Sequence, residues 1–424
     1  MHEPCEPPDY GACVVKWCTL AVVVYYVIGP ALAAGSAANA LKEAEEHNNR
    51  GVHLAAKGQY GDAVEAFNSA IRAAPEMVVS YYNLGLAYTR MDEFVRAQEA
   101  FETAVRIRPE NGNVWFHLGR ALQSQEKIQE ALEAYTVALR LKPADPDVRF
   151  WLGVASWLEK DWSQAAAQWE ALIVENPDHA AVPKAWEELP RAYFNLGTAR
   201  RESGDLDKAV EAYKEALRLR PDYADAHLNL GDLYGDSGKY SLALASLRRV
   251  EQLWSDDIRV YLGLGVVYLG QDSLRLAQDQ FSRALELDKR SAEAQYGLAT
   301  SYLRQGKVEE ALKSALQLLL MAPNETRSHK LLAFVHEHND EGVRYGEGFR
   351  AEEAIRAYAN ALRLDPEDAG MYFSIGTIFG RNGKWQEAYR AYTQALVIDS
   401  LHAETLKWLP LVEEKLREGK EVQR

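Results

Sequence analysis

Apolar residues recur along the chain at the spacing of helix faces, as pairs of short stripes separated by a polar turn. One stripe contains Leu118 and Leu122, and the next contains Ala131, Tyr135 and Ala138. Residues three, four and seven positions apart lie on the same side of an α-helix. The pattern therefore predicts two amphipathic helices in succession and indicates an all-α protein.

The same pair of stripes returns with a period of 34 residues, marked by small residues at fixed positions. In six copies a glycine follows a leucine: Gly85, Gly119, Gly153, Gly197, Gly231 and Gly265. Twelve residues later stands an alanine: Ala97, Ala131, Ala165, Ala209, Ala243 and Ala277. The turn between the stripes often contains a glycine: Gly58, Gly204, Gly238, Gly306 and Gly383. Several copies end in proline: Pro109, Pro143, Pro177 and Pro221.

The recurring positions of these small residues and prolines have a physical explanation. The small residues indicate close helix crossings, where a larger side chain would overpack the contact at a cost of about 1–3 kcal/mol. Proline ends the second helix because the residue before it is pushed out of helical geometry. One helix pair cannot bury its apolar faces alone, so neighbouring pairs are expected to stack into a solenoid.

The repeated unit resembles the tetratricopeptide repeat (TPR). The stretch VWFHLGRALQSQEKIQEALEAYTVALRLKP, residues 114–143, matches the family pattern best. We place the array at residues 44–402. Ten copies begin near residues 44, 78, 112, 146, 190, 224, 258, 292, 326 and 369. The resemblance implies a right-handed superhelix of helix pairs, with a concave groove lined by the first helix of each pair.

The segments outside the regular period are also interpreted. Residues 35–43 are read as a short lead-in to the array. An insertion near 180–189 is expected to lengthen a first helix at its N-terminal end, with Pro190 as a potential kink. A second insertion, near 340–350, is expected to be a glycine-rich turn extension. Residues 403–424 are predicted to form a capping helix, charged on its outer side, and a tail.

Residues 1–34 have the features of a secretory signal or a membrane anchor. Lys16 precedes the apolar stretch WCTLAVVVYYVI, and small residues follow around 31–33. This order is typical of a signal peptide. Twelve helical residues span about 18 Å, short of the roughly 30 Å hydrocarbon core, but extension to Ala34 would give an anchor. We expect an exported protein, periplasmic or anchored in the membrane facing the periplasm; a mis-assigned start or a non-targeting segment is the remaining alternative.

Composition and charge restrict the partners. The chain is 47% hydrophobic and 26% charged, with a formal net charge of −14. Nucleic-acid binding usually needs a basic face, and anionic lipid repels an acidic surface. We therefore expect no nucleic-acid partner and no membrane contact beyond the N-terminal segment. The three cysteines lie within the first 18 residues, which excludes a cysteine-based metal site or disulfide framework downstream.

The sequence motifs of common catalytic sites are absent. There is no G-x4-G-K-[ST] phosphate loop, no G-x-S-x-G nucleophile turn and no H-E-x-x-H zinc pair. One group of residues has a ligand-like composition: His329, His336, His338 and Asp340. The first two fall on repeat positions where the family packs apolar or aromatic side chains, so packed or solvated histidines are favoured. We predict no enzymatic activity, no metal site and no cofactor.

The resemblance implies that the fifth and sixth positions of each first helix face the groove. Together with Trp157, residues at these positions form the predicted peptide-binding groove: Tyr82, Asn83, Phe116, His117, Phe150, Trp151, Trp157, Phe194, Asn195 and Asn229. An asparagine amide can pair with both the donor and the acceptor of a peptide backbone, and aromatic neighbours supply contact area at small entropic cost. Alternatively, these residue types are simply common at these positions. The basic set with which some TPR domains hold chaperone tails is not matched.

Repeat four is unusually rich in tryptophan. Trp169 replaces the usual core aromatic residue of a second helix and is expected to be buried, whereas Trp151 and Trp157 fall on groove positions. Exposed tryptophans are frequent binding hot spots. The leading hypothesis is a non-catalytic scaffold or adaptor that binds a protein or peptide segment in an envelope or membrane-associated assembly. The alternative is an accessory subunit or carrier that binds a glycan or small molecule at the aromatic patch. Self-association or a larger complex stays open.

Overall fold

The structure, a computed structural model, describes residues 29–338, 343–346 and 349–421. Within these residues the regular secondary structure is helical, apart from one isolated antiparallel bridge between His338 and Arg344. The all-α prediction is confirmed. The predicted signal or anchor lies outside the described residues up to position 28, and so do its cysteines.

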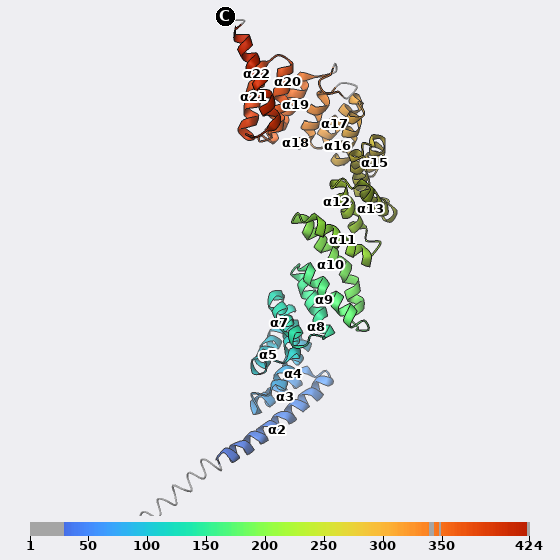
Figure 1. Cartoon of the computed structure of the whole chain (residues 1–424). Helices are drawn as coiled ribbons and strands as arrows, with labels where there is room; N and C mark the ends of the chain where they lie inside the picture. Colours follow the sequence, from blue (N-terminus) through green and yellow to red (C-terminus); the bar gives the residue numbers. More distant parts are fainter. Residues whose placement is uncertain (1–28, 339–342, 347–348, 422–424) are drawn as a thin grey trace, which may run out of the picture. The chain divides into compact units, whose positions relative to one another are not determined.

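The described residues form 21 helices, which alternate as first and second members of the repeats (Figure 1). The first helices are α2 (Gly29–Ala56), α4 (Val78–Arg90), α6 (Gly112–Gln123), α8 (Pro146–Leu158), α10 (Val182–Glu202), α12 (Ala224–Asp236), α14 (Ile258–Gly270), α16 (Ala292–Arg304), α18 (Thr326–His336) and α20 (Ala369–Arg381). The second helices are α3 (Tyr60–Ala73), α5 (Phe94–Ile107), α7 (Ile128–Leu141), α9 (Trp162–Glu175), α11 (Leu206–Leu219), α13 (Tyr240–Leu253), α15 (Leu274–Leu287), α17 (Val308–Met321), α19 (Ala351–Leu364) and α21 (Trp385–Ile398). The last helix, α22 (Ala403–Glu421), follows them.

The chain divides into two compact units, residues 1–199 and 200–424, with the boundary inside α10. In the first unit, helices α2 to α9 pack as four pairs, and each second helix also contacts the next first helix as far as α8. In the second unit, helices α12 to α21 pack as five pairs in the same manner, and α22 packs against α21. The predicted stacking of helix pairs is confirmed within each unit.

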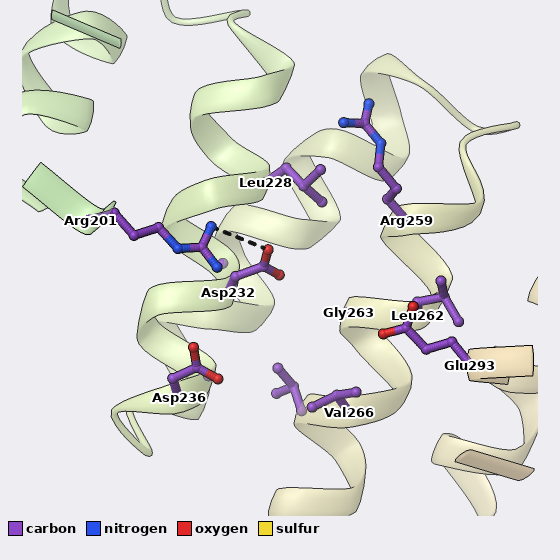
Figure 2. Close-up of a pocket in the computed structure, with 12 residues that line it drawn as sticks. Arg201, Leu228, Asp232, Asp236, Arg259, Leu262, Gly263, Val266 and Glu293 are labelled. Atoms are coloured by element: carbon purple, nitrogen blue, oxygen red, sulfur yellow. Dashed lines mark ion pairs between the residues drawn. The ribbon is translucent and has the colours of Figure 1, made fainter. Parts of the chain in front are cut away.

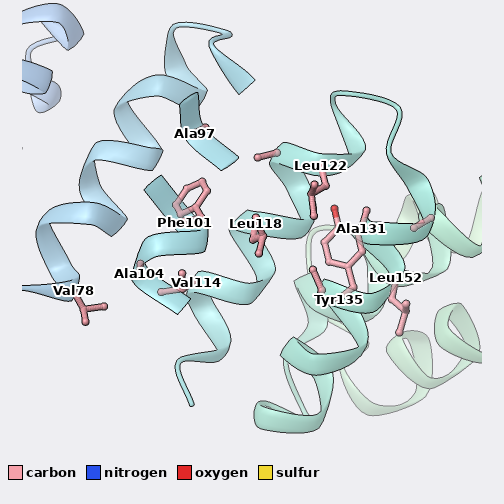
Figure 3. Packing of buried hydrophobic residues seen from close by; sticks show 13 residues of the cluster. Val78, Ala97, Phe101, Ala104, Val114, Leu118, Leu122, Ala131, Tyr135 and Leu152 are labelled. Carbon is pink, nitrogen blue, oxygen red and sulfur yellow. The ribbon is translucent and has the colours of Figure 1, made fainter. Parts of the chain in front are cut away.

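The core of each unit consists of several clusters of buried side chains between successive helices. Figure 3 shows one of these clusters in the first unit, where Phe101 and Tyr135 from second helices enclose Leu118 of α6. All three side chains are buried. Most second helices contribute one large buried residue and two or more alanines, and the first helix of the following repeat packs against them.

The repeat glycines lie where second-helix side chains pack directly on the first helix. A Cβ atom on Gly119 would be 2.7 Å from Cδ1 of Tyr135, and one on Gly153 would be 2.4 Å from Nε1 of Trp169. Trp169 is 1% exposed, as the sequence predicted. Its indole N–H donates to the carbonyl of Phe150 at 3.3 Å, so the larger ring is also satisfied as a donor.

The turn inside most repeats passes through one residue in the left-handed region. Five of these residues are glycines with φ between 70° and 81°: Gly58, Gly204, Gly238, Gly306 and Gly383. Four are not glycine and have φ between 58° and 63°: Asp92, Glu126, Lys160 and Asp272. Left-handed geometry costs a non-glycine residue roughly 1–2 kcal/mol. The same turn conformation is therefore adopted even by residues that disfavour positive φ, because the packing of the two helices determines the shape of the turn.

The N-terminal helix and the first insertion extend the regular pattern. Helix α2 begins at Gly29, so the predicted lead-in at 35–43 is already helical, which fits its alanine-rich sequence. The insertion near 180–189 lies in the N-terminal half of α10, which has 21 residues and continues through the buried Pro190.

The second insertion follows α18 and is partly described. Glu337 is completely buried and forms an ion pair with Arg344, whose neighbour Tyr345 donates its backbone N–H to the Glu337 carbonyl at 2.5 Å. Residues 339–342 and 347–348 lie outside the described part. The described residues of this turn are thus held by an ion pair between a buried carboxylate and an exposed arginine, a feature that the glycine content of the turn did not indicate.

Helix α22 has exposed apolar residues beside charged ones such as Glu404. Leu406 is 47% exposed, whereas Trp408 and Leu411 line a cleft together with Trp385 and Tyr392 of α21. Apolar positions of this helix repeat the pattern of a first helix, but no second helix follows among the described residues.

The glycine contacts give a direct test of the packing. We expect Gly119→Ala to lower the free energy of unfolding by about 1–2 kcal/mol, because the added methyl group would overlap the buried Tyr135 ring. The matched control is Gly61→Ala in α3, where nothing lies within 4 Å of the added atom. Removing a helical glycine there should stabilise the protein by up to about 1 kcal/mol. Urea unfolding followed by circular dichroism measures both; equal stabilities would contradict the packing role.

Candidate functional site

Successive first helices contact one another within each unit and form one face of the array, here called the first-helix face. In the first unit α4 contacts α6 and α6 contacts α8; in the second unit α12 contacts α14 and α14 contacts α16. Successive second helices show no comparable contact in the described part of the chain. The backbone is therefore most closely spaced on the first-helix face, which makes this the inner side of each unit.

The predicted groove residues of repeats two and three form one ring cluster on this face. The imidazole of His117 lies 5.5 Å from the Tyr82 ring and 5.0 Å from the Phe116 ring, both at steep angles. It also stacks on the buried Phe101 ring at 5.9 Å. Tyr82, Phe116 and His117 are half-buried. One side of the cluster therefore rests on the core while the other remains accessible.

The charge around this cluster is positive. Burial lowers the pKa of His117 to about 4, and the nearby cations Arg120, Arg90 and Lys142 act in the same direction. His117 is therefore neutral at physiological pH. Arg90 and Arg120 form no ion pair with a described residue, whereas Lys142 pairs with Asp145. The ring cluster is thus flanked by two guanidinium groups that remain open to a partner.

Repeat four continues the aromatic surface. The guanidinium carbon of Arg120 lies 3.8 Å from the centre of the Trp151 ring, close enough for a cation–π contact. Phe150 meets Trp151 edge-to-face at 5.5 Å. Trp151 and Phe150 are both half-buried. The sequence analysis predicted that these two neighbouring aromatic residues face the groove. The structure adds the contact of Trp151 with Arg120, which the sequence analysis did not single out.

Trp157 lies at the end of α8 in a separate small cleft. Its ring is 4.8 Å from Trp162 and 5.9 Å from Trp169. Phe150, Lys184 and Glu188 line the same cleft, which has a volume of about 170 Å³. Lys184 and Glu188 belong to the insertion in α10 and form an ion pair at 2.9 Å. The insertion thus contributes polar walls to an aromatic cleft.

The predicted groove asparagines make hydrogen bonds within the chain. The Asn83 side-chain N–H donates to Oδ1 of Asn48 at 3.0 Å. In the second unit, the Asn229 N–H donates to the hydroxyl of Tyr213 at 3.1 Å. One N–H of each amide is thus engaged within the chain, and Oδ1 of Asn229 also accepts from Arg201 at 3.5 Å. Phe194 and Asn195 lie on α10 and are half-buried.

The second unit contains a cleft that the sequence reasoning missed. It has a volume of about 330 Å³ and lies across α12, α14 and α16. Figure 2 shows its charged residues: Arg201, Asp232, Asp236, Arg259 and Glu293. Its apolar wall includes Leu228, Leu262 and Val266. Two features of the sequence could have indicated this cleft. Acidic residues lie near the repeat glycine Gly231, and one repeat later there is a further glycine, Gly263.

Asp232 has the most perturbed carboxyl group of this cleft. Burial raises its pKa to about 6, and the carboxylates of Asp236 and Glu293 add to the rise. Arg201 and Arg259 oppose it. The Arg201 guanidinium lies 4.0 Å from Asp232 and also donates to Oδ1 of Asn229 at 3.5 Å. Asp232 is therefore a carboxylate whose charge is incompletely balanced by its surroundings.

Comparison with protein-family models identifies the repeats. A model described as "Tetratricopeptide repeat" matches residues 29–78, 82–146, 116–181, 262–326 and 340–403, which together cover more than half of the chain. A second model with the same description matches 224–253, and one described as "TPR repeat" matches 197–238. The chain belongs to the tetratricopeptide repeat family. The resemblance drawn from the residue pattern is thereby confirmed.

Several solved structures also match this chain. Yeast Tom70 is 14% identical, with 89% of this chain and 96% of that chain covered and a TM-score of 0.41. A structure of Naa15/Naa10 bound to HypK-THB is 13% identical, with coverages of 89% and 67% and a TM-score of 0.47. MamA protein is 27% identical, with coverages of 43% and 96% and a TM-score of 0.36. A comparison with curated proteins gives no match.

The histidines of this TPR chain are held by local contacts. Nε2 of His329 lies 3.0 Å from the Pro323 carbonyl, and Nδ1 of His338 lies 2.6 Å from the Phe334 carbonyl. Burial lowers the pKa of His336 and of His338. Among the described residues no three His, Cys, Asp or Glu side chains converge as metal ligands; Asp340 lies outside them. No described helix has the length and apolar character needed to cross a bilayer.

The shifted Asp232 carboxyl group leads to a stability test. Its pKa is raised above the unfolded value of 3.8, so ionisation destabilises the folded state, fully above about pH 6 and not below about pH 4. We expect Asp232→Asn to raise the free energy of unfolding at pH 7.5 by about 1 kcal/mol, after discounting for a carboxylate that is 37% exposed.

The stabilisation by the same variant should be smaller near pH 4, where the wild-type carboxyl group is protonated in the folded state and about half protonated in the unfolded state. Urea unfolding at the two pH values measures the difference. A variant less stable than wild type at pH 7.5 would show that the Arg201 contact outweighs the cost of burial.

Proposed function

We propose that this TPR protein is a non-catalytic scaffold or adaptor that binds a protein or peptide segment on its first-helix face. The observation that carries the proposal is the row of half-buried rings on α4, α6 and α8, from Tyr82 through His117 and Phe116 to Phe150 and Trp151. Such rings offer large, rigid contact area at small entropic cost. An extended segment lying across successive first helices would cover them in turn.

The electrostatics of this row support a peptide partner. Arg120 stacks on Trp151, and Arg90 lies near His117 without an acidic partner among the described residues. A guanidinium group fixed on an aromatic ring can pair with a carboxylate or a backbone carbonyl of the partner. Tryptophan and arginine are the residue types most often found at binding hot spots.

The alternative of a glycan or small-molecule carrier has weaker support. The cleft beside Trp157 has a volume of about 170 Å³, whereas small-molecule pockets commonly have about 300–1,000 Å³. Of the aromatic row, Phe150 also lines this cleft. The small volume of the cleft therefore favours a partner that inserts a single side chain over one that binds as a whole small molecule.

The cellular location is also a proposal. We infer an exported protein, periplasmic or tethered to the membrane by its N-terminal segment, that acts within an envelope assembly. Its support is the order of Lys16, the apolar residues 17–28 and the small residues after them. Immunoblotting of fractionated source cells would test this location, and recovery only with cytoplasmic marker proteins would contradict it.

The aromatic row can be tested by truncating its tryptophan. We expect Trp151→Ala to reduce partner recovery in affinity purification from solubilised envelope fractions by at least about tenfold, because hot-spot tryptophans contribute about 2 kcal/mol or more. Quantitative mass spectrometry of the recovered proteins measures the change. Circular dichroism checks that the variant is folded.

The matched control is Trp186→Ala in α10. Trp186 is 46% exposed and lies two residues from both Lys184 and Glu188, on the opposite side of the helix from the Trp157 cleft. This control removes an exposed tryptophan without altering the row. Equal recovery by wild type and Trp151→Ala would exclude the row as the binding surface.

A further inference from the structure

The cleft of the second unit lies across three adjacent first helices, two of which contribute glycines. Gly231 and Gly235 of α12 and Gly263 of α14 line it. The closest approaches of a Cβ atom at Gly235 and at Gly263 would be to Val267, at 3.3 Å, and to Leu247, at 3.0 Å. Neighbouring side chains thus pack tightly against these glycines, and the open volume of about 330 Å³ lies beside them.

The balance of charge in this cleft is negative. Arg259 is engaged at its edge by Asp257, with an Nη2–Oδ2 distance of 2.6 Å, and by Asp225 at 3.3 Å. Its charge is therefore compensated by residues that do not line the cleft. Asp236 and Glu293 line the cleft and form no ion pair with a described residue.

The remaining cation is Arg201, which faces Asp232 only at 4.0 Å. Figure 2 shows that these two side chains point toward one another, with Asp236 one helical turn further along α12. One long cation-to-carboxylate contact does not neutralise three carboxyl groups. The cleft thus retains an unbalanced negative charge at neutral pH, which complements a cationic group of a partner.

The apolar wall fits the stem of a long cationic side chain. Leu228, Leu262 and Val266 line the cleft, and Val266 is 51% exposed although it lies on the inner side of α14. Lysine and arginine bury their methylene groups on apolar surface while their charged ends contact carboxylates. An acidic cleft with an apolar wall offers both parts of this interaction.

We propose that this cleft receives a lysine or arginine side chain of the bound segment, with its stem on Leu262 and Val266 and its charge between Asp232 and Glu293. This inference rests on the proposed scaffold function and deepens it by giving the partner a cationic residue. A divalent metal is a poorer occupant, because no three of these carboxylates converge as ligands in the described residues. A cationic side chain can contact carboxylates that are spread along the cleft.

Selection from random peptides displayed on phage tests the proposal with the full chain immobilised. We expect sequences recovered by wild type to be enriched in lysine or arginine. A fluorescent copy of the most enriched peptide should bind the Asp232→Asn/Glu293→Gln double variant about tenfold more weakly in anisotropy titrations. Both substitutions keep side-chain size, and thermal unfolding checks that the variant is folded.

The matched control is Glu211→Gln/Asp279→Asn, which removes the same charges from exposed positions of α11 and α15. We expect this control to bind the peptide like wild type. Recovered peptides without basic enrichment, or with equal affinity for the double variant, would overturn the cleft assignment and leave the scaffold function standing. If wild type selects no peptide above a protein-free surface, both proposals fail.

Discussion

The contact between a bare glycine on most first helices and a large side chain on the paired second helix determines the geometry of this solenoid. Phe101 on Gly85, Tyr135 on Gly119 and Trp169 on Gly153 all lie closer than a Cβ atom would allow. Phenylalanine, tyrosine and tryptophan can all pack at this position, because the glycine has no Cβ atom and each ring occupies the space that a Cβ atom would fill. Helix spacing is thereby kept from repeat to repeat while ring size varies.

The side of each first helix that faces away from the second helix takes no part in this contact. Core packing uses the side that faces the second helix, so residues on the first-helix face vary without loss of the fold. In the first unit that variation gives Tyr82, His117 and Trp151 with two open arginines. In the second unit it gives a cleft with Asp232 and further carboxylates. One scaffold thus carries surfaces of opposite charge.

The period, the helix pairs and the buried Trp169 could be predicted because each follows from spacing within a single repeat. The contact of Arg120 with Trp151 could not, since it joins residues from different repeats through rotamers that spacing does not determine. The acidic cleft was missed for a related reason. Its charge balance depends on Arg259 being engaged by Asp257 and Asp225, which only the three-dimensional arrangement shows.

Irregularities in the array add structure that regular stacking does not supply. A strict repeat would leave the rings of Phe150 and Trp157 against an ordinary neighbouring helix. The inserted residues of α10 instead place Lys184 and Glu188 beside these rings, and their ion pair borders the aromatic cleft. In the second insertion, the ion pair of the buried Glu337 with Arg344 joins the two ends of the inserted turn. A regular solenoid repeats the same contacts in every repeat. Insertions that interrupt the period can therefore create a surface that occurs only once in the array.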